Sequence, residues 1–67
     1  MQFKLKTETI ELMALLKITG MAGTGGQAGI IITNSEVKVN GEVELRKRAK
    51  LKAGDIVEHA GQKILLI

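Results

Sequence analysis

The amino-acid sequence predicts a single α+β domain, residues 1–67, in which a short N-terminal strand and two helices pack on a small antiparallel sheet. Two observations predict this class. Apolar residues recur with the helical period between residues 11 and 35, and they alternate with polar residues, as in a strand, from residue 36 onward. A chain of this length buries only about 60% of its unfolded surface, so the core is thin. Because neither helix could bury its apolar stripe alone, the sheet must cover both.

At the N-terminus, Phe3 and Leu5 alternate with lysines, which indicates a short edge strand. A helix is expected next, from about residue 11 to residue 18. The residues on its stripe are Leu12, Leu15, Leu16 and Thr19. Gly20 follows, and glycine suits the left-handed conformation that ends many helices.

The second helix is expected to begin after Thr24. Thr24 and Gln27 have the spacing of a capping box, in which side chains accept hydrogen bonds from free amides at the start of a helix. The residues on its stripe are Ala28, Ile31, Ile32 and Ser35. The glycine-rich stretch between residues 20 and 29 therefore joins two short helices.

A small sheet is expected to follow the helices. Val37 and Val39 alternate with charged residues. Asn40-Gly41 is then a strong hairpin signal, because a type I′ turn needs positive φ at both central residues. The other expected strands are residues 42–45, 56–59 and 62–67, with turns at residues 53–55 and 60–61.

Positive charge is concentrated in one segment. The net charge is +3, and five of the ten basic residues are Arg46, Lys47, Arg48, Lys50 and Lys52. The rest of the chain, with five lysines and seven carboxylates, is slightly negative. Such a stripe fits a polyanionic partner, although a solvated charged loop fits the charge pattern equally well.

Composition narrows the class of protein further. The chain has no cysteine, which excludes disulfides and thiolate metal sites and fits a reducing compartment. No stretch approaches the roughly 20 apolar residues of a membrane span, and the N-terminus has no apolar signal-peptide core. We therefore expect a cytoplasmic protein that acts as a monomer.

Residues 23–28 read G-x-G-x-x-A, a fragment of the dinucleotide-binding fingerprint. That fingerprint follows a strand inside a βαβ unit, whereas here a helix precedes it and a hairpin follows the next helix. A phosphate-binding loop would also need a lysine where Gln27 stands. An interhelix turn is the preferred interpretation, and neither a cofactor nor a small-molecule substrate is expected.

No catalytic or metal site is indicated either. His59 is the only histidine and has no second metal ligand at useful spacing. Glu42 and Glu44 lie on one side of a predicted strand, but they are better explained as partners for the basic residues than as a catalytic pair. Thr24 has no candidate base nearby. The chain is therefore expected to be a non-enzyme.

The motifs, taken in order, resemble the alpha-L RNA-binding domain, the S-four type named after a small-subunit ribosomal protein. The residues that carry the resemblance are Ile10-x-Leu12, Leu15-Leu16-Lys17, Gly25-Gly26-x-Ala28, Val37-x-Val39-Asn40-Gly41, Arg46-x-Arg48-x-x-Leu51 and Gly54-Asp55-x-Val57. The run G-G-x-A…V-x-V followed by R-x-R-x-K is similar to that of the small stand-alone bacterial members, the YbcJ and YaaA type. The resemblance covers about residues 8–62.

The resemblance implies an RNA-binding face made by the second helix, the glycine-rich turn before it and the hairpin. The residues implied at or beside this face are Thr24, Gly25, Gly26, Gln27, Lys38, Arg46, Lys47, Arg48, Lys50 and Lys52. The physical chemistry agrees, because a helix N-terminus binds phosphate and glycines let a nucleic-acid backbone approach. The implied function is non-catalytic binding of structured RNA, such as ribosomal or transfer RNA, with the ribosome as a further candidate partner.

Two positions depart from the family pattern. Gly29 stands where members often carry a basic residue, and Ile30 falls off the buried stripe, so binding is expected to rest on residues 46–52. Phe3 is the only aromatic residue, which favours readout of RNA backbone and shape over base stacking. If four or five cations each neutralise a phosphate, the log–log dependence of affinity on salt has a slope of about −3 to −5.

A protein-interaction module is the alternative class. An exposed Ile30 and a free strand edge at residues 63–67 could pair with a partner protein. Association that is insensitive to salt and needs no RNA would favour it. Binding to a membrane surface is less favoured, because the basic residues do not fall on one helix stripe.

Overall fold

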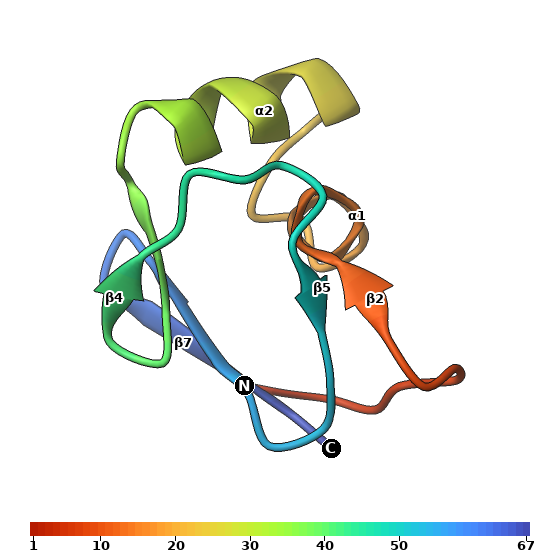
Figure 1. Ribbon diagram of the computed structural model, residues 1–67. Helices are drawn as coiled ribbons and strands as arrows, with labels where there is room; N and C mark the ends of the chain where they lie inside the picture. Colours follow the sequence, from red (N-terminus) through yellow and green to blue (C-terminus); the bar gives the residue numbers. More distant parts are fainter.

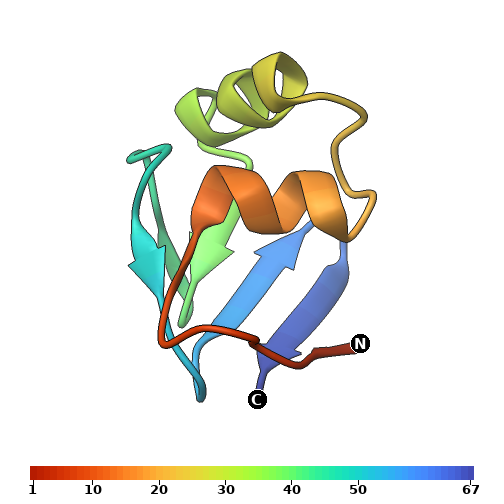
Figure 2. The same cartoon turned by 90° about the vertical axis from the view of Figure 1, so that its right-hand side faces the viewer.

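The computed structural model describes residues 1–67 as two helices, a five-stranded sheet and a two-stranded sheet (Figures 1 and 2). The helices are α1 (Leu12–Ile18) and α2 (Gly25–Thr33). The strands are β1 (Gln2–Phe3), β2 (Ile10–Glu11), β3 (Val37–Val39), β4 (Glu42–Val43), β5 (Lys50–Leu51), β6 (Ile56–His59) and β7 (Gln62–Leu66). The larger sheet has the order β1-β7-β6-β3-β4, and β2 pairs with β5. The predicted α+β class is confirmed.

The larger sheet is mixed rather than wholly antiparallel, which corrects the expectation from the sequence. β3, β4, β6 and β7 pair antiparallel, whereas β1 runs parallel to β7. The Leu5 amide donates to the Ile67 carbonyl at 2.9 Å, and the Ile67 amide donates to the Phe3 carbonyl at 2.9 Å. Alternation of apolar and polar residues indicates an extended strand, but it does not predict whether the neighbouring strand runs parallel or antiparallel. β7 is thus paired on both sides, and the prediction of a free edge at residues 63–67 is wrong.

Two hairpin turns set the register of the sheet. Asn40 and Gly41 have φ angles of 53° and 86°, as predicted for a type I′ turn. Ala60 and Gly61, with φ angles of 51° and 78°, join β6 to β7. The Asn40 side chain also accepts a hydrogen bond from the Ile56 amide at 2.9 Å, which ties the first turn to β6.

Both helices begin within about one residue of the predicted positions; α1 ends at Ile18 as predicted, whereas α2 ends at Thr33, before the predicted stripe residue Ser35. Gly20 follows α1 with a left-handed φ of 80°. Thr24 caps α2, since its Oγ1 accepts a hydrogen bond from the Gln27 amide at 3.1 Å. The Gln27 Oε1 accepts from the Gly23 amide at 2.8 Å, one residue earlier than in the usual capping box. Ser35, predicted on the α2 stripe, lies exposed beyond the helix with a φ of 63°.

The two helices pack against each other on one side of the larger sheet (Figure 2). Their stripes and the inward side chains of the strands form one core. Its members are Leu12, Leu15, Leu16, Ala22, Ala28, Ile31, Ile32, Val37, Ala49, Leu51, Val57, Ile64 and Leu66. In Figure 1, the loop from β4 to β5 runs beneath α2 toward α1, and Lys47 and Arg48 of this loop lie beside the glycines of α2.

Candidate nucleic-acid interface

The basic segment, defined as residues 46–52, is held against the start of α1 by its own main chain. The residue before α1 provides no side-chain cap, so the first amides of the helix need other acceptors. The Leu12 amide donates to the Ala49 carbonyl at 2.9 Å, and the Met13 amide donates to the Lys47 carbonyl at 3.0 Å. The end of the segment also forms β5, which pairs with β2 directly before α1. This anchoring fixes the backbone of the basic segment relative to the helices.

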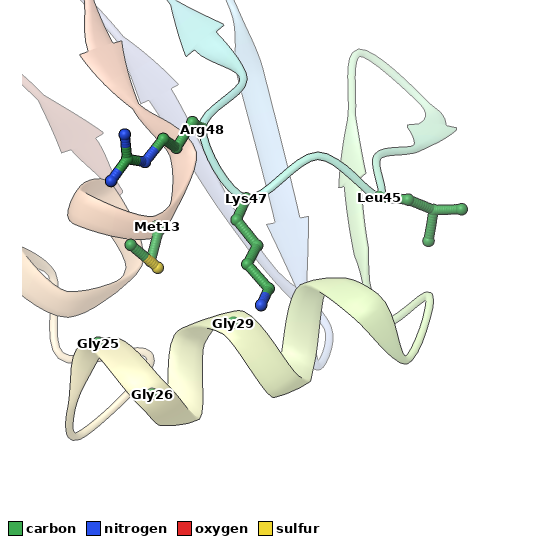
Figure 3. A pocket seen from close by; sticks show the side chains of 7 residues that line it. All are labelled: Met13, Gly25, Gly26, Gly29, Leu45, Lys47 and Arg48. Carbon is green, nitrogen blue, oxygen red and sulfur yellow. The ribbon is translucent and has the colours of Figure 1, made fainter.

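A groove of about 670 Å³ lies between the basic segment and α2 (Figure 3). Its lining residues are Met13, Gly25, Gly26, Gly29, Leu45, Lys47 and Arg48. In Figure 3, Lys47 reaches from the segment to α2, and Arg48 and Met13 lie above the first turn of that helix. Leu45 points away at the other end of the groove. One wall therefore carries two cations, and the other wall is glycine backbone.

The α2 wall presents main chain to solvent. A Cβ atom at Gly25 would meet nothing within 4 Å, and a Cβ at Gly26 would meet only Thr24 Oγ1 at 3.9 Å. These glycines are the first two residues of α2, so their amides have no acceptor in the helix, and they make no other hydrogen bond in the protein. Free amides at the positive end of a helix dipole favour an anion.

Lys47 and Arg48 supply the positive charge of the groove. Neither forms an ion pair, since the single salt bridge of the protein joins Arg46 to Glu44. The stem of Lys47 lies across Gly29, where a Cβ atom would come within 3.2 Å of Lys47 Cε and 3.4 Å of Cδ. The sequence of α2 contains no basic residue, yet the Lys47 ammonium reaches this helix from the basic segment.

Arg46 is engaged by Glu44. Arg46 Nε and one terminal nitrogen each donate to a Glu44 carboxylate oxygen at 3.1 Å, and the Arg46 amide donates to the same carboxylate at 3.0 Å. The side-chain and backbone hydrogen bonds from Arg46 lower the pKa of Glu44 from 4.5 to about 2, and the same contact raises the pKa of Arg46. Glu44 is thus the predicted partner of a basic residue, whereas Glu42 forms no salt bridge. β4 ends at Val43, directly before this pair, instead of at residue 45.

Four other residues predicted at the site do not line the groove. Thr24 and Gln27 cap the helix end that carries the free amides. Lys50 is exposed in β5, opposite Glu11 of β2. Lys52 follows β5, which runs away from α2 in Figure 1. The structure therefore brings Lys50 closer to the groove than Lys52.

Lys52 belongs to a turn that Asp55 organises. The Lys52 amide donates to Asp55 Oδ2 at 2.9 Å, and the Asn40 side chain donates to Oδ1 at 3.0 Å. Partial burial alone would raise the pKa of Asp55, but these hydrogen bonds outweigh burial and lower it. Asp55 thus acts as a structural residue at the far end of β5.

Lys38 lines a second groove, of about 190 Å³, on the sheet. It lies in β3 opposite Glu58 of β6, and both side chains reach this groove. His59 lies beside them, with Nδ1 at 3.1 Å from the Glu36 carbonyl. The structure therefore separates Lys38 from the groove at α2. No group of three or more His, Cys, Asp or Glu residues is placed to hold a metal ion.

Three lining residues, Met13, Leu45 and Gly29, were not predicted at the site. Met13 packs half-buried against the core while it also faces the groove. Gly29 was interpreted only as a missing charge. One signal was present in the sequence, because Gly25, Gly26 and Gly29 have the spacing of one helix face. Nothing in the sequence around Leu45 distinguishes a groove residue from an ordinary residue of the predicted strand 42–45.

The fold and the groove define a small alpha-L-type domain, and the chain belongs to the S4 domain family, whose pattern matches residues 3–67. It therefore carries the alpha-L RNA-binding motif, as the resemblance implied. YbcJ of Escherichia coli (strain K12) is 45% identical to it over 58 residues, 87% of this chain and 83% of YbcJ. "Probable ribosome maturation protein RlbA" of Bacillus subtilis is 40% identical over 55 residues, 82% of this chain and 78% of RlbA.

A solved structure shows the same fold. The solution structure of E. coli YbcJ matches with a TM-score of 0.74 and 43% sequence identity, and the match covers 98% of this chain and 85% of that one. That structure is described as revealing an alpha-L motif involved in RNA binding. In the present structure, no helix has the length and apolar character needed to cross a membrane.

Proposed function

We propose that this protein is a non-catalytic RNA-binding protein that holds the sugar–phosphate backbone of structured RNA in the groove between α2 and the basic segment. The observation that carries the proposal is the position of two unpaired cations, Lys47 and Arg48, across the groove from the free amides of Gly25 and Gly26. A phosphate between these walls would accept hydrogen bonds from the amides and from the arginine fork. The glycines lack side chains, so a nucleic-acid backbone can approach the helix closely.

The absence of a stacking platform supports readout of RNA shape. Phe3, the only aromatic residue, belongs to β1 and packs against the core, and it does not line the groove. Proteins that read unpaired bases usually stack them on aromatic side chains. The groove is suited instead to phosphates and 2′-hydroxyl groups of duplex or folded RNA.

The relatives support RNA as the partner and favour ribosomal RNA. YbcJ is described with a motif involved in RNA binding, and RlbA is named for ribosome maturation. Among RNA partners, we favour ribosomal RNA, free or within the ribosome, over transfer RNA. We propose that the protein binds this RNA as a monomer in the cytoplasm. The bound RNA backbone would be flanked by Lys50, Thr24 and Gln27. Arg46 would contact the RNA only after its salt bridge with Glu44 breaks. Lys38 and Lys52 would lie outside the main contact.

Charge reversal at the groove tests the proposal. Arg48→Glu is compared with Lys6→Glu, which changes the net charge equally at an exposed residue outside the groove. Fluorescence anisotropy with a labelled ribosomal RNA helix or transfer RNA at about 0.1 M salt should show a loss of roughly tenfold or more for Arg48→Glu. Lys6→Glu should change affinity by less than about twofold, because a distant exposed charge is screened. Equal affinity for both variants would refute the proposed site.

A second pair of variants tests the helix N-terminus. Gly26→Glu places a carboxylate where the phosphate is proposed, but a carboxylate in the first turn of a helix also stabilises that helix. The variant should therefore fold at least as stably as the native protein and bind RNA more weakly. Gly26→Gln adds similar bulk without charge and should lose less affinity. Equal losses in both variants would contradict a phosphate at this position.

The protein-interaction alternative has lost one of its two supports. The edge of β7 is covered by β1, so it does not offer a strand for pairing. Ile30 remains, and it is 61% exposed on α2. Capture of one protein without RNA, with an affinity that does not change with salt, would favour this alternative.

A further inference from the structure

Gly29 is a glycine in the middle of α2, where glycine is less favourable than alanine because it loses more backbone entropy on folding. It is also buried. What covers it is the side chain of Lys47, because a Cβ atom at residue 29 would come within 3.2 Å of Cε, 3.4 Å of Cδ and 3.6 Å of Nζ. A Cβ at either of the other two glycines of this helix would meet no atom closer than 3.9 Å. Among the glycines of α2, only Gly29 has a neighbouring side chain so close that an added Cβ would crowd it.

We infer that Gly29 is a positioning residue, which by lacking a side chain lets Lys47 lie across α2 and keeps its ammonium in the groove. The inference rests on the proposed function, since it concerns how the groove holds its charge. Two constraints act on the lysine. Its carbonyl accepts the Met13 amide at 3.0 Å, which fixes the root, and the backbone of Gly29 supports the stem. No carboxylate pairs with the ammonium, so it stays available to a phosphate.

The energetic consequence concerns rotamer entropy. A free lysine loses much side-chain freedom when it is fixed in a complex, and this loss weakens binding. A lysine whose stem already lies on the protein has lost part of that freedom before RNA arrives. A basic segment with a supported Lys47 should therefore bind more tightly than the same segment with a mobile one.

Gly29→Ala tests the inference, because its Cβ would displace the end of Lys47 without removing any charge. The variant should keep the fold and melt at an equal or higher temperature, since alanine favours the helix. Its affinity for the labelled ribosomal RNA helix should fall about threefold to tenfold, as for the loss of one well-placed phosphate contact. Ile30→Ala is the matched control, because it also raises helix propensity but lies outside the groove. It should leave affinity unchanged.

A double-mutant cycle separates positioning from a general effect on the helix. In a Lys47→Ala background, Gly29→Ala should cause no further loss of affinity. Native affinity for Gly29→Ala, or an equal loss in the Lys47→Ala background, would overturn the inference.

A measurement without RNA keeps the two proposals distinguishable. The native protein should show a nuclear Overhauser effect between the Lys47 Hε protons and the Gly29 Hα protons. Its absence in the native protein would overturn the positioning role. If it is present while neither ribosomal nor transfer RNA binds, positioning stands and the proposed function fails.

Discussion

Replacing Glu44 by glutamine should strengthen RNA binding, because it releases Arg46 to contact phosphate. In the native protein, two side-chain hydrogen bonds of 3.1 Å hold the arginine on the carboxylate. The pKa of Glu44 is about 2, so the pair stays charged at every pH at which binding would be measured. Glutamine keeps an oxygen that can accept the Arg46 amide but removes the opposing charge.

The size of the effect follows from the number of available cations. Lys47, Arg48 and Lys50 form no salt bridge, so three phosphate contacts are expected in the native complex. At about −0.7 to −0.9 per contact, the slope of log affinity against log salt should lie between about −2.1 and −2.7. A fourth contact moves it to between about −2.8 and −3.6. If the plots of log affinity against log salt for the native protein and Glu44→Gln meet near 1 M salt, Glu44→Gln binds RNA roughly fivefold to eightfold more tightly at about 0.1 M salt.

The assay is a salt titration of fluorescence anisotropy with the same RNA for the native protein, Glu44→Gln and Glu42→Gln. The Glu42 variant makes the same change in net charge at an exposed residue without a salt bridge, so it should leave the slope unchanged. An equal gain for both variants would show a general effect of charge. An unchanged slope for Glu44→Gln would refute the reasoning that Arg46 can reach the RNA.

Three further predictions concern stability. Leu16→Ala should lower the free energy of unfolding by about 3 kcal/mol, because it opens a cavity at a fully buried residue, whereas Ile18→Ala on the exposed surface should cost less than about 0.5 kcal/mol in urea denaturation. Thr24→Ala should cost about 1 kcal/mol by removing the cap of α2, and an unchanged urea midpoint would contradict that role. The pKa of Glu44 is lowered to about 2, so its stabilisation is present above about pH 4.5 and is lost as the pH falls toward 2; the pKa of Asp55 is also lowered, so its stabilisation is lost when acid protonates its carboxylate. Melting curves of Glu44→Gln and Asp55→Asn should show a weaker decline across this range, and a decline parallel to that of the native protein would contradict the prediction.

The elements that the sequence could predict are those with a local cause. The stripes of both helices, the caps at Gly20 and Thr24 and the turn at Asn40-Gly41 depend on neighbouring residues, and the structure has all of them except Ser35 of the second stripe. β2 and β5 contain two residues each, too few to show a period, and they pair where the basic segment also supplies acceptors to α1. The parallel pairing of β1 with β7 could not be predicted either, because the direction in which two strands pair depends on the tertiary structure and not on the residues of one strand.

The candidate site divides in the same way. Local patterns pointed to the glycines of α2 and to the basic segment, but no pattern could show which cations the fold leaves unpaired. Arg46 and Lys47 are adjacent in sequence, yet one is bound to a carboxylate and the other lies across a glycine of a different element. Gly29 was interpreted from the sequence as a lost charge. In the structure, the side chain of Lys47, which comes from the basic segment, lies across Gly29.

The short pairing of β1 with β7 also matters for the solubility of the protein. The strand that it covers ends in Lys63-Ile64-Leu65-Leu66-Ile67, a run of high β-propensity with a single charge. Met1 and Phe3 accept hydrogen bonds from the amides of Leu65 and Ile67, each at 2.9 Å. Without the first few residues, these donors would form an open edge that a second chain could extend. The two-residue strand β1 thus covers the edge of a segment that could otherwise extend a sheet with a second chain.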